Sequence, residues 1–413
     1  MRTDLVPAEE ALAIILGDAG PGASETVPLS RAGGRVLASD LAARRTQPPF
    51  AASAMDGYAV RAADVQSVPA NLRLVGEAAA GHPFGGKVGE GETARIFTGA
   101  PVPAGADAIV IQENVSAKGA TITILQSSSV GRHIRPEGLD FATGDVLLRR
   151  GDLIDPQRLS LAAAMNHASL PVYRKPRVAL FATGDELALP GEETGAGGII
   201  ASNTFGLAAM VASSGGEVDD LGIVRDTRAA LERALKQAID GGADLILTTG
   251  GASVGDHDLI APALKALGAE IRFSKIALRP GKPLIFASLQ TGGRVIRALG
   301  LAGNPVSSIV AGYRFVVPLI TKLAGLPMQR AAPLDAVFGC ELPANDEREE
   351  YMRATVRRRE DGTLEATPFP RQDSSMLANL ARADALVIRA AHAPAASIGD
   401  PCRLFLLRQD KAL

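Results

Sequence analysis

An apolar run that ends in a glycine loop occupies residues 244–256, which read DLILTTGGASVGD. A second run of this kind, RVALFATGDEL, occupies residues 177–187. Both runs are short, rich in β-favouring residues and followed by glycine, which is typical of a buried strand that turns into a loop. Helical patterns lie between such runs. This alternation predicts βαβ units and a doubly wound parallel sheet with helices on both faces.

The expected elements of this α/β region follow from the same alternation. Strands are predicted at 178–182, 218–224, 244–248, 271–277, 284–287 and 295–301. Helices are predicted at 203–214, 227–240, 256–267 and 305–323. The last helix should begin at Asn304-Pro305, because asparagine is favoured at the N-cap and proline at the first helical position.

The regions on either side of the α/β stretch have a different pattern. Short β-type runs separated by glycine and proline turns predict a β-rich unit at 44–144, with strands at 72–75, 94–97, 108–112 and 121–125. Another is predicted at 328–413, with strands at 351–356, 386–388 and 402–407. Helical patterns at 8–16 and 156–166 flank the first β-rich unit. We therefore expect a split domain formed by 1–43 and 145–174, the inserted domain 44–144, an α/β domain at 175–327 and a C-terminal domain at 328–413. A simple linear order of domains would give the same local patterns.

Composition excludes several classes of protein. The 413 residues include 43 basic and 45 acidic side chains, so there is no positive excess to attract nucleic acid. The two cysteines, Cys340 and Cys402, cannot form a disulfide framework or a zinc cluster, which favours the cytoplasm. The apolar stretch 306–323 contains Arg314 and Lys322, so no membrane segment is expected.

The glycine loop after the strand at 244–248 is the first candidate for ligand binding. In an open α/β sheet, ligands bind outside the carboxyl ends of the strands, where loop amides and helix N-termini converge. Glycines there let the backbone approach a phosphate closely. The candidate substrate-binding residues of this loop are Gly250, Gly251, Ser253, Gly255 and Asp256. The spacing alone is equally compatible with a simple strand-to-helix turn.

Acidic and basic side chains follow the same strand ends. Carboxylates suit Mg²⁺ held together with substrate phosphates, and the candidate metal ligands are Asp185, Glu186, Asp226 and Asp258. Asp256 is equally well explained as a helix cap. Candidate anion-binding and substrate-binding residues on the other side are Lys275, Arg279, Lys282, Asn304 and Pro305. A solvated charged loop is the alternative for the three cations.

Motifs in the first β-rich unit are unremarkable by themselves. Asp56 precedes Gly57 and Thr98 precedes Gly99, and both pairs are ordinary turn signals. The histidines have no metal-ligand spacing, and no nucleophile motif stands out. Covalent catalysis is therefore not expected.

Taken together, the motifs resemble those of a known family. In order, they are SAMDGYAV (53–60), FTGAP (97–101), TGDEL (183–187), GGASVG (250–255), RPGKP (279–283) and GNP (303–305). This set looks like the molybdopterin molybdenumtransferases, which include the E domain of gephyrin. The resemblance runs from about residue 1 to 327, and six motifs in the family's order are far more specific than any one of them.

The resemblance implies a fold and an activity. It implies a central molybdopterin-binding α/β domain, an inserted β-rich domain and a C-terminal β-barrel-like domain, in a homodimer whose active cleft lies between two subunits. The implied reaction inserts molybdenum from molybdate into adenylylated molybdopterin and releases AMP, with Mg²⁺ required. The implied partners are these substrates, a second copy of the chain and other molybdenum cofactor biosynthesis proteins. Whether tungstate replaces molybdate stays open.

The resemblance also assigns roles residue by residue. The positions that match the family's catalytic residues are Asp56, Thr98, Asp140, Glu186, Asp226 and Asp258. Arg279 stands where the family often has lysine, which keeps the charge and changes the donor geometry. Arg353 and Ser375 are further candidates for holding molybdate. The alternatives for function are molybdopterin adenylylation, because such enzymes have a similar α/β domain, and a non-catalytic scaffold.

Overall fold

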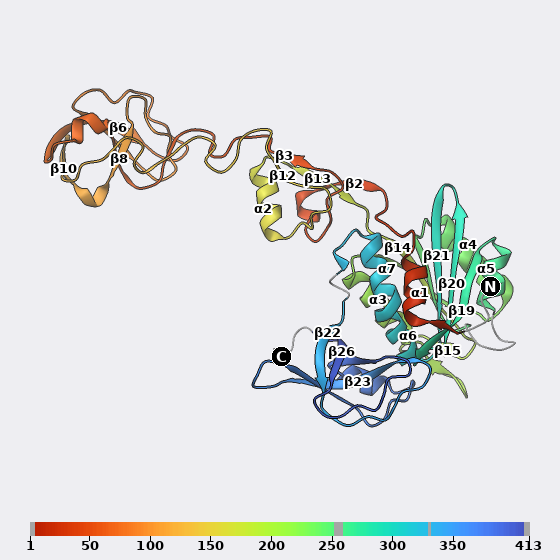
Figure 1. Cartoon of the computed structure of the whole chain (residues 1–413). Helices are drawn as coiled ribbons and strands as arrows, with labels where there is room; N and C mark the ends of the chain where they lie inside the picture. Colours follow the sequence, from red (N-terminus) through yellow and green to blue (C-terminus); the bar gives the residue numbers. More distant parts are fainter. Residues whose placement is uncertain (1–4, 252–258, 329–331, 409–413) are drawn as a thin grey trace. The chain divides into compact units, whose positions relative to one another are not determined.

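The computed structural model describes residues 5–251, 259–328 and 332–408 (Figure 1). The chain forms two compact units. The larger comprises residues 1–25, 34–36 and 172–413, and the smaller comprises residues 26–33 and 37–171. The predicted α/β and C-terminal domains therefore lie in the larger unit, and the predicted inserted domain lies in the smaller. Residues of the predicted split domain occur in both units, so its boundaries stay a prediction.

A mixed sheet forms the centre of the α/β domain. Its strands are β14 (Arg177–Thr183), β17 (Glu217–Val224), β18 (Leu245–Thr249), β19 (Glu270–Arg279), β20 (Pro283–Thr291) and β21 (Arg294–Leu301). Their order is β17-β14-β18-β21-β20-β19. The first four are parallel, and β20 runs antiparallel to both of its neighbours. The predicted parallel α/β sheet is confirmed, with an antiparallel pair at one edge.

Helices cover both faces of this sheet (Figure 1). One face carries α1 (Ala8–Leu16), α3 (Asn203–Ser213), α6 (Pro305–Ala311) and α7 (Val317–Leu323), and the other carries α4 (Arg228–Asp240) and α5 (Ile260–Ala266). Strand β14 illustrates this arrangement, because its successive side chains point to opposite faces of the sheet. Val178 and Leu180 pack with the first helix group, whereas Ala179 and Phe181 pack with the second. Burial of both faces explains the continuous apolar runs of the sequence.

The helical stretch from Pro305 to Leu323 is interrupted by a π-helical turn at Gly312–Val316. Within the described ranges it is the one helical stretch that is long and apolar enough to span a membrane, and 78% of that window is buried inside the protein. Val310, Phe315 and Leu319 belong to the core of the α/β domain. We interpret the stretch as a core helix.

The strand order creates a switch point in the α/β sheet. After β14 the chain passes through α3 to β17 on one side, and then through α4 to β18 on the other side of β14. The loops that follow β14 and β18 therefore diverge, and this divergence opens a crevice at the carboxyl ends of the two strands. Thr183 and Thr249 end these strands at the crevice.

The C-terminal domain is a closed barrel. Its strands are β22 (Leu334–Phe338), β23 (Glu349–Arg358), β24 (Leu364–Pro368), β25 (Ala385–Arg389) and β26 (Pro401–Leu406), and α8 spans Leu377–Arg382. β23 pairs with β24 and β25, β22 pairs with β24 and β26, and β25 pairs with β26, so the ring has no free edge. The predicted β-barrel-like domain is confirmed. β22 and β24 have no counterpart among the strands expected from the sequence.

The smaller unit contains a separate sheet. Its strands are β5 (Gly57–Val60), β6 (Ala70–Ala78), β7 (Glu92–Ile96), β8 (Ala108–Ile111), β9 (Val115–Lys118) and β10 (Thr121–Ile124), in the order β8-β5-β7-β6-β10-β9. Shorter pairs are β3 (Leu41–Ala42) with β12 (Val146–Leu148) and β4 (Ala52–Ser53) with β11 (Ile134–Arg135). Helix α2 spans Pro156–Ala164, and the Asp155 side chain caps it. The β-rich character of this unit is confirmed.

The remaining elements are short. They are β1 (Val6–Pro7), β2 (Ser24–Pro28), β13 (Ser169–Tyr173), β15 (Leu187–Ala188) and β16 (Ile199–Ile200), and the 3₁₀ turns Leu29–Arg31, Ala62–Val65 and Gln112–Asn114. β15 and β16 pair with each other in parallel beside the crevice of the α/β domain.

Candidate active site

A cavity of about 760 Å³ lies at the carboxyl ends of the α/β strands. It is lined by Thr183 at the end of β14, by Thr249 at the end of β18 and Gly250 after it, and by Gly303 after β21. Residues of the C-terminal barrel complete one side. Small-molecule sites usually enclose roughly 300–1,000 Å³, so a ligand of the size of a nucleotide or a pterin fits here.

Gly250 is required by the close approach of two loops at the switch point. Its φ is +85°, and a Cβ atom there would lie 2.1 Å from the carbonyl oxygen of Thr183. Gly251 also has a positive φ, at +62°. Gly250 lines the cavity, and Gly251 is the next residue in the sequence. The other predicted residues of this loop, Ser253, Gly255 and Asp256, lie outside the described residues.

Three of the four predicted metal ligands lie close to Thr183 at one corner of the cavity, and of these Glu186 alone is among the residues that line it. The buried Thr183 hydroxyl donates a hydrogen bond to the Asp226 carboxylate. The Asp226 N–H is 3.3 Å from Asp185 Oδ1, so these two acids are neighbours. Glu186 is exposed and lines the cavity. The loops after β14 and β17 thus carry hard oxygen donors to one place.

The acidic corner suits a magnesium ion in its donor chemistry, because Mg²⁺ prefers one or two carboxylates together with water and phosphate oxygens. Among the described residues, no three His, Cys, Asp or Glu side chains are grouped closely enough to hold a metal ion by themselves. The fourth predicted ligand, Asp258, lies outside those residues. Magnesium at this corner stays a prediction.

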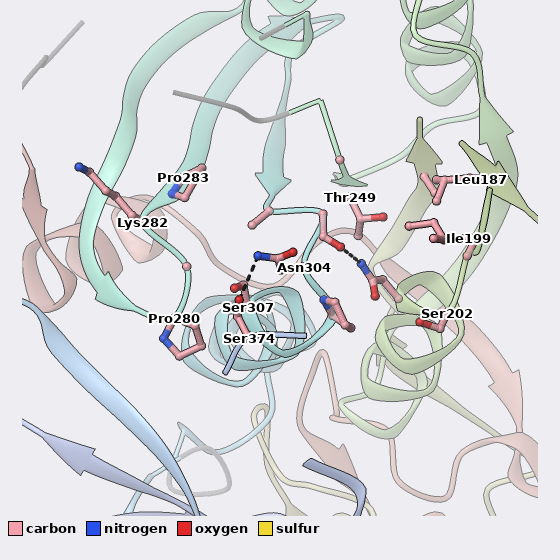
Figure 2. A pocket seen from close by; sticks show the side chains of 18 of the residues that line it. Leu187, Ile199, Ser202, Thr249, Pro280, Lys282, Pro283, Asn304, Ser307 and Ser374 are labelled. Carbon is pink, nitrogen blue, oxygen red and sulfur yellow. Dashed lines mark hydrogen bonds between the residues drawn. The ribbon is translucent and has the colours of Figure 1, made fainter. Parts of the chain in front are cut away.

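Basic side chains line the opposite side of the cavity. Lys282 is exposed, and Figure 2 shows it beside Pro280 and Pro283 on the loop between β19 and β20, across from Leu187 and Ile199. Arg279 also lines the cavity. Lys275, the third predicted cation, lies on β19 and is not among the residues that line the cavity.

The N-terminus of the helix at Pro305 is capped by the C-terminal barrel. Asn304 occupies the N-cap position as predicted, but its side chain makes no cap within the helix. Instead, Asn304 Nδ2 donates to Ser374 Oγ at 3.0 Å (Figure 2). The Val306 N–H donates to the Ser374 carbonyl at 3.1 Å. The expected side-chain cap is therefore replaced by a contact with a different domain.

The barrel supplies cavity residues that the sequence did not indicate. They are Arg348, Gln372, Asp373 and Ser374. Only the folded structure places them at the cavity. In it, β19 and β23 pair in parallel and bring Arg279 opposite Glu350. In the printed sequence these residues lie in the domain with the weakest motifs.

Arg353 and Ser375, the two candidates from the barrel, lie beside the same segment. Arg353 is fully buried, and burial lowers its pKa. Its Nε and Nη1 have no hydrogen-bond partner within the described part of the chain. The Ser375 hydroxyl donates to Asp373 at 2.6 Å. A buried guanidinium with free donors is a feature that an anion could satisfy.

The smaller unit brings together Asp56 and Thr98. Asp56 Oδ1 accepts hydrogen bonds from the Thr98 N–H at 2.7 Å and from the Thr98 hydroxyl at 2.8 Å. These bonds, the backbone one first, lower the pKa of the Asp56 carboxyl. Asp140 is exposed in the same unit, and its N–H donates to the Gln47 carbonyl.

Comparison with known families covers nearly the whole chain. Residues 6–166 match the family model described as "MoeA N-terminal region (domain I and II)". Residues 179–322 match "Probable molybdopterin binding domain", and residues 335–407 match "MoeA C-terminal region (domain IV)".

Individual relatives agree with these models. The chain is 37% identical over 375 residues to the molybdopterin molybdenumtransferase of Nostoc sp., covering 88% of this chain and 84% of the relative. It is 32% identical over 417 residues to that of Bacillus subtilis, covering 98% and 95%. A crystal structure of the molybdopterin biosynthesis MoeA protein of Pyrococcus horikoshii is similar with a TM-score of 0.81 and 28% identity, covering 98% of this chain and 100% of that one. The chain therefore belongs to the molybdopterin molybdenumtransferase family, whose members are enzymes of molybdenum cofactor biosynthesis.

Proposed function

We propose that this enzyme inserts molybdenum from molybdate into adenylylated molybdopterin and releases AMP in an Mg²⁺-dependent reaction. The observation that carries the proposal is the cavity at the switch point, which has Glu186 at one corner, with Asp226 bonded to the lining residue Thr183, and has Lys282 on the opposite side. A substrate that joins a phosphate linkage to a metal-accepting dithiolene needs both kinds of group within one cavity.

The acidic and the basic residues of the cavity have different roles in the proposed reaction. Glu186, Asp226 and Asp185 would hold Mg²⁺, which supplies charge neutralisation for the phosphates and polarises phosphorus when bound. Thr183 holds the Asp226 carboxylate by its hydroxyl. Lys282 offers positive charge to molybdate or to phosphate oxygens, and Arg279 adds to the positive charge of the same wall.

The reaction requires no protein nucleophile in this proposal. Water cleaves the phosphoanhydride, so that AMP leaves with one phosphate and the pterin keeps the other. As the two dithiolene sulfurs bind molybdenum, their two protons leave with one molybdate oxygen as water. The apolar side chains of Leu187, Ile199 and Ile200 form a wall of the cavity. Such a wall suits the flat face of a pterin or an adenine ring.

We further propose that the enzyme is a cytoplasmic homodimer. The resemblance implies that the acids of the smaller unit act on a substrate bound to the α/β domain of the partner subunit. The Asp56–Thr98 pair supports this proposal, because it orients an ionised carboxylate on a turn whose residues are not among those that line the cavity of the α/β domain. Other proteins of molybdenum cofactor biosynthesis are the expected partners.

The deciding experiment measures AMP. Purified enzyme is incubated with adenylylated molybdopterin, molybdate and Mg²⁺, and AMP is quantified against a reaction without molybdate. We expect molybdate-stimulated release of AMP that fails in Asp56→Ala and Glu186→Ala. Consumption of ATP with bare molybdopterin would instead identify an adenylyltransferase. Normal activity in both variants would show that the active site lies elsewhere.

A further inference from the structure

The seam between the α/β domain and the barrel is built by strand pairing. The last residues of β19 pair in parallel with the first residues of β23, Leu278 with Glu349 and Arg279 with Glu350. The barrel residues just before β23 therefore lie beside the end of β19, close to Arg279. Both segments line the same cavity through Arg279, Lys282 and Arg348.

Asp346 lies between two guanidinium groups at this seam. Its Oδ2 pairs with Arg279 Nη2 and accepts from Arg348 Nη2 at 2.9 Å, while its Oδ1 accepts from the Arg348 N–H at 3.0 Å. Hydrogen bonds from Arg279 and then from Arg348 hold the pKa of Asp346 well below its usual range. One carboxylate thus fixes two cations from different domains.

Arg279 and Arg348 differ in the number of carboxylates that they contact. Arg279 has a second carboxylate, Glu350, at 3.5 Å, and its Nη2 also reaches Asn345 Oδ1 at 3.5 Å. Within the described residues, the only ion pair of Arg348 is the one with Asp346. The buried Nε atoms of both arginines have no hydrogen-bond partner there, so the difference lies in the number of carboxylates that each one contacts. A guanidinium has five N–H donors in a planar fork, so Arg348 keeps donors for a ligand.

Hydrogen bonds hold the backbone around Arg348 in place and so fix the direction of its guanidinium group. Asn345 Nδ2 donates to the Arg348 carbonyl at 2.8 Å and to the Ala390 carbonyl at 2.8 Å. A preorganised loop loses little conformational freedom when a ligand binds. The charge on Arg348 is therefore fixed at the cavity wall before any substrate arrives.

We propose that Arg348 contacts a tetrahedral oxyanion of the substrate, and that Arg279 acts as a positioning residue that holds Arg348 through Asp346. This inference rests on the cavity being the substrate site of the proposed function. The oxyanion is either molybdate or a phosphate of the adenylylated substrate, since both present oxygens that a guanidinium fork can bind.

This arrangement explains why arginine suits position 279 better than lysine does. A guanidinium can bond Asp346 and reach Glu350 at the same time, whereas a lysine ammonium is a compact point charge on a flexible stem. Arg279→Lys should therefore keep the charge of the wall and loosen the loop that presents Arg348.

The test is anion binding, measured by calorimetry with molybdate alone and with AMP alone. We expect Arg348→Gln to weaken at least one of these two probes by roughly tenfold, the effect of losing a charge-assisted hydrogen bond. Arg348→Lys should fall between the wild type and Arg348→Gln. The control is Arg233→Gln, which removes an exposed arginine on α4, remote from the cavity wall, and should bind as the wild type does. The probe that weakens identifies the source of the oxyanion.

The positioning role is tested by combining variants. If Asp346 acts through Arg348, then Asp346→Asn weakens the same probe, and the double variant Asp346→Asn with Arg348→Gln binds no more weakly than Arg348→Gln alone. Additive losses would overturn the positioning role. Melting temperatures of all variants show that the protein remains folded.

The outcomes separate this inference from the proposed function. Unchanged binding of both probes in Arg348→Gln, or no binding of either probe by the wild type, would overturn the inference. If the wild type releases AMP but Arg348→Gln leaves the KM unchanged, the function stands and the inference falls. If binding depends on Arg348 but no AMP is released, the inference stands and the function falls.

Discussion

Asp56 and Thr98 lie 42 positions apart in the chain and are joined by two hydrogen bonds to a single carboxylate oxygen. The sheet of the smaller unit explains the contact, because Gly57 on β5 pairs with Ile96 on β7. The turn before one strand and the turn after the other therefore meet. Two donors on one oxygen stabilise the carboxylate form, which lowers the pKa of Asp56.

Replacing Thr98 by valine should raise the pKa of Asp56 toward its ordinary value. Valine removes the hydroxyl donor and keeps the shape, while the backbone N–H bond, the larger contribution, remains. The rise is therefore partial. It is measured by following the Asp56 carboxyl carbon in an NMR titration. Thr123→Val, on β10 of the same sheet, is the control and should leave the Asp56 titration in place. An unchanged titration in Thr98→Val would contradict the role of the hydroxyl.

Mixed dimers test whether the active site is shared between subunits. We expect Asp56→Ala and Glu186→Ala to be inactive as separate proteins. In a mixed dimer with shared sites, one site carries both substitutions and the other carries neither. Random exchange makes half of the dimers mixed, so about a quarter of wild-type activity should return. A site built within one chain would give no recovery, and differently tagged subunits allow the mixed species to be purified.

Much of the α/β domain was predictable from the sequence because both faces of its sheet are buried. Continuous apolar runs such as 178–182 and 244–248 have few alternatives when helical patterns separate them. Strand β5 was not predicted, because Asp56-Gly57 signals a turn and hides the short strand that follows. β22 and β24 were missed in the barrel, where polar and apolar residues are mixed.

The candidate site was predictable only where it follows local rules. Glu186 and Gly250 lie at strand ends, and the switch-point rule places strand ends in the crevice. Arg348 and Ser374 reach the same cavity through the pairing of β19 with β23 and through the cap on the helix at Pro305. No local pattern encodes a contact between domains, so these residues could not be found from the sequence.

Gly250→Ala should destabilise the larger unit more than an equivalent change elsewhere. The added Cβ would lie 2.1 Å from the Thr183 carbonyl oxygen in a backbone with φ of +85°. Gly292 is the matched control, because its φ is +57° and nothing lies within 4 Å of its added Cβ. Gly292→Ala should cost about 1 kcal/mol, and Gly250→Ala roughly 2 kcal/mol more.

These stabilities are compared through the midpoints of urea unfolding, followed by circular dichroism because the chain has no tryptophan. Equal shifts for Gly250→Ala and Gly292→Ala would show that the two strand-end loops can separate freely. That result would remove the structural reason for glycine at the switch point.

Removal of the acidic corner should change the requirement for magnesium. Asp226→Asn lowers the charge available to Mg²⁺ and weakens its acceptance of the Thr183 hydroxyl bond. We expect a higher concentration of Mg²⁺ for half-maximal AMP release, and loss of activity in the wild type when EDTA is added. Asp240→Asn, at an exposed ion pair on α4, is the control and should leave the magnesium dependence as in the wild type. An unaltered magnesium dependence in Asp226→Asn would exclude this corner as the metal site.

Asp346 should make the stability of the domain seam depend on pH. Its pKa in the folded protein is lowered by Arg279 and Arg348, whereas the unfolded value is near 3.8. The folded state therefore gains stability from the ionised carboxylate at every pH above about 4, and loses it progressively as the pH falls below that value toward the folded pKa. Asp346→Asn removes this gain. The melting temperature of the variant should lie below that of the wild type at pH 7, and the difference should narrow at pH 3. A difference that stays constant from pH 7 to pH 3 would mean that Asp346 stabilises the seam by its shape and not by its charge.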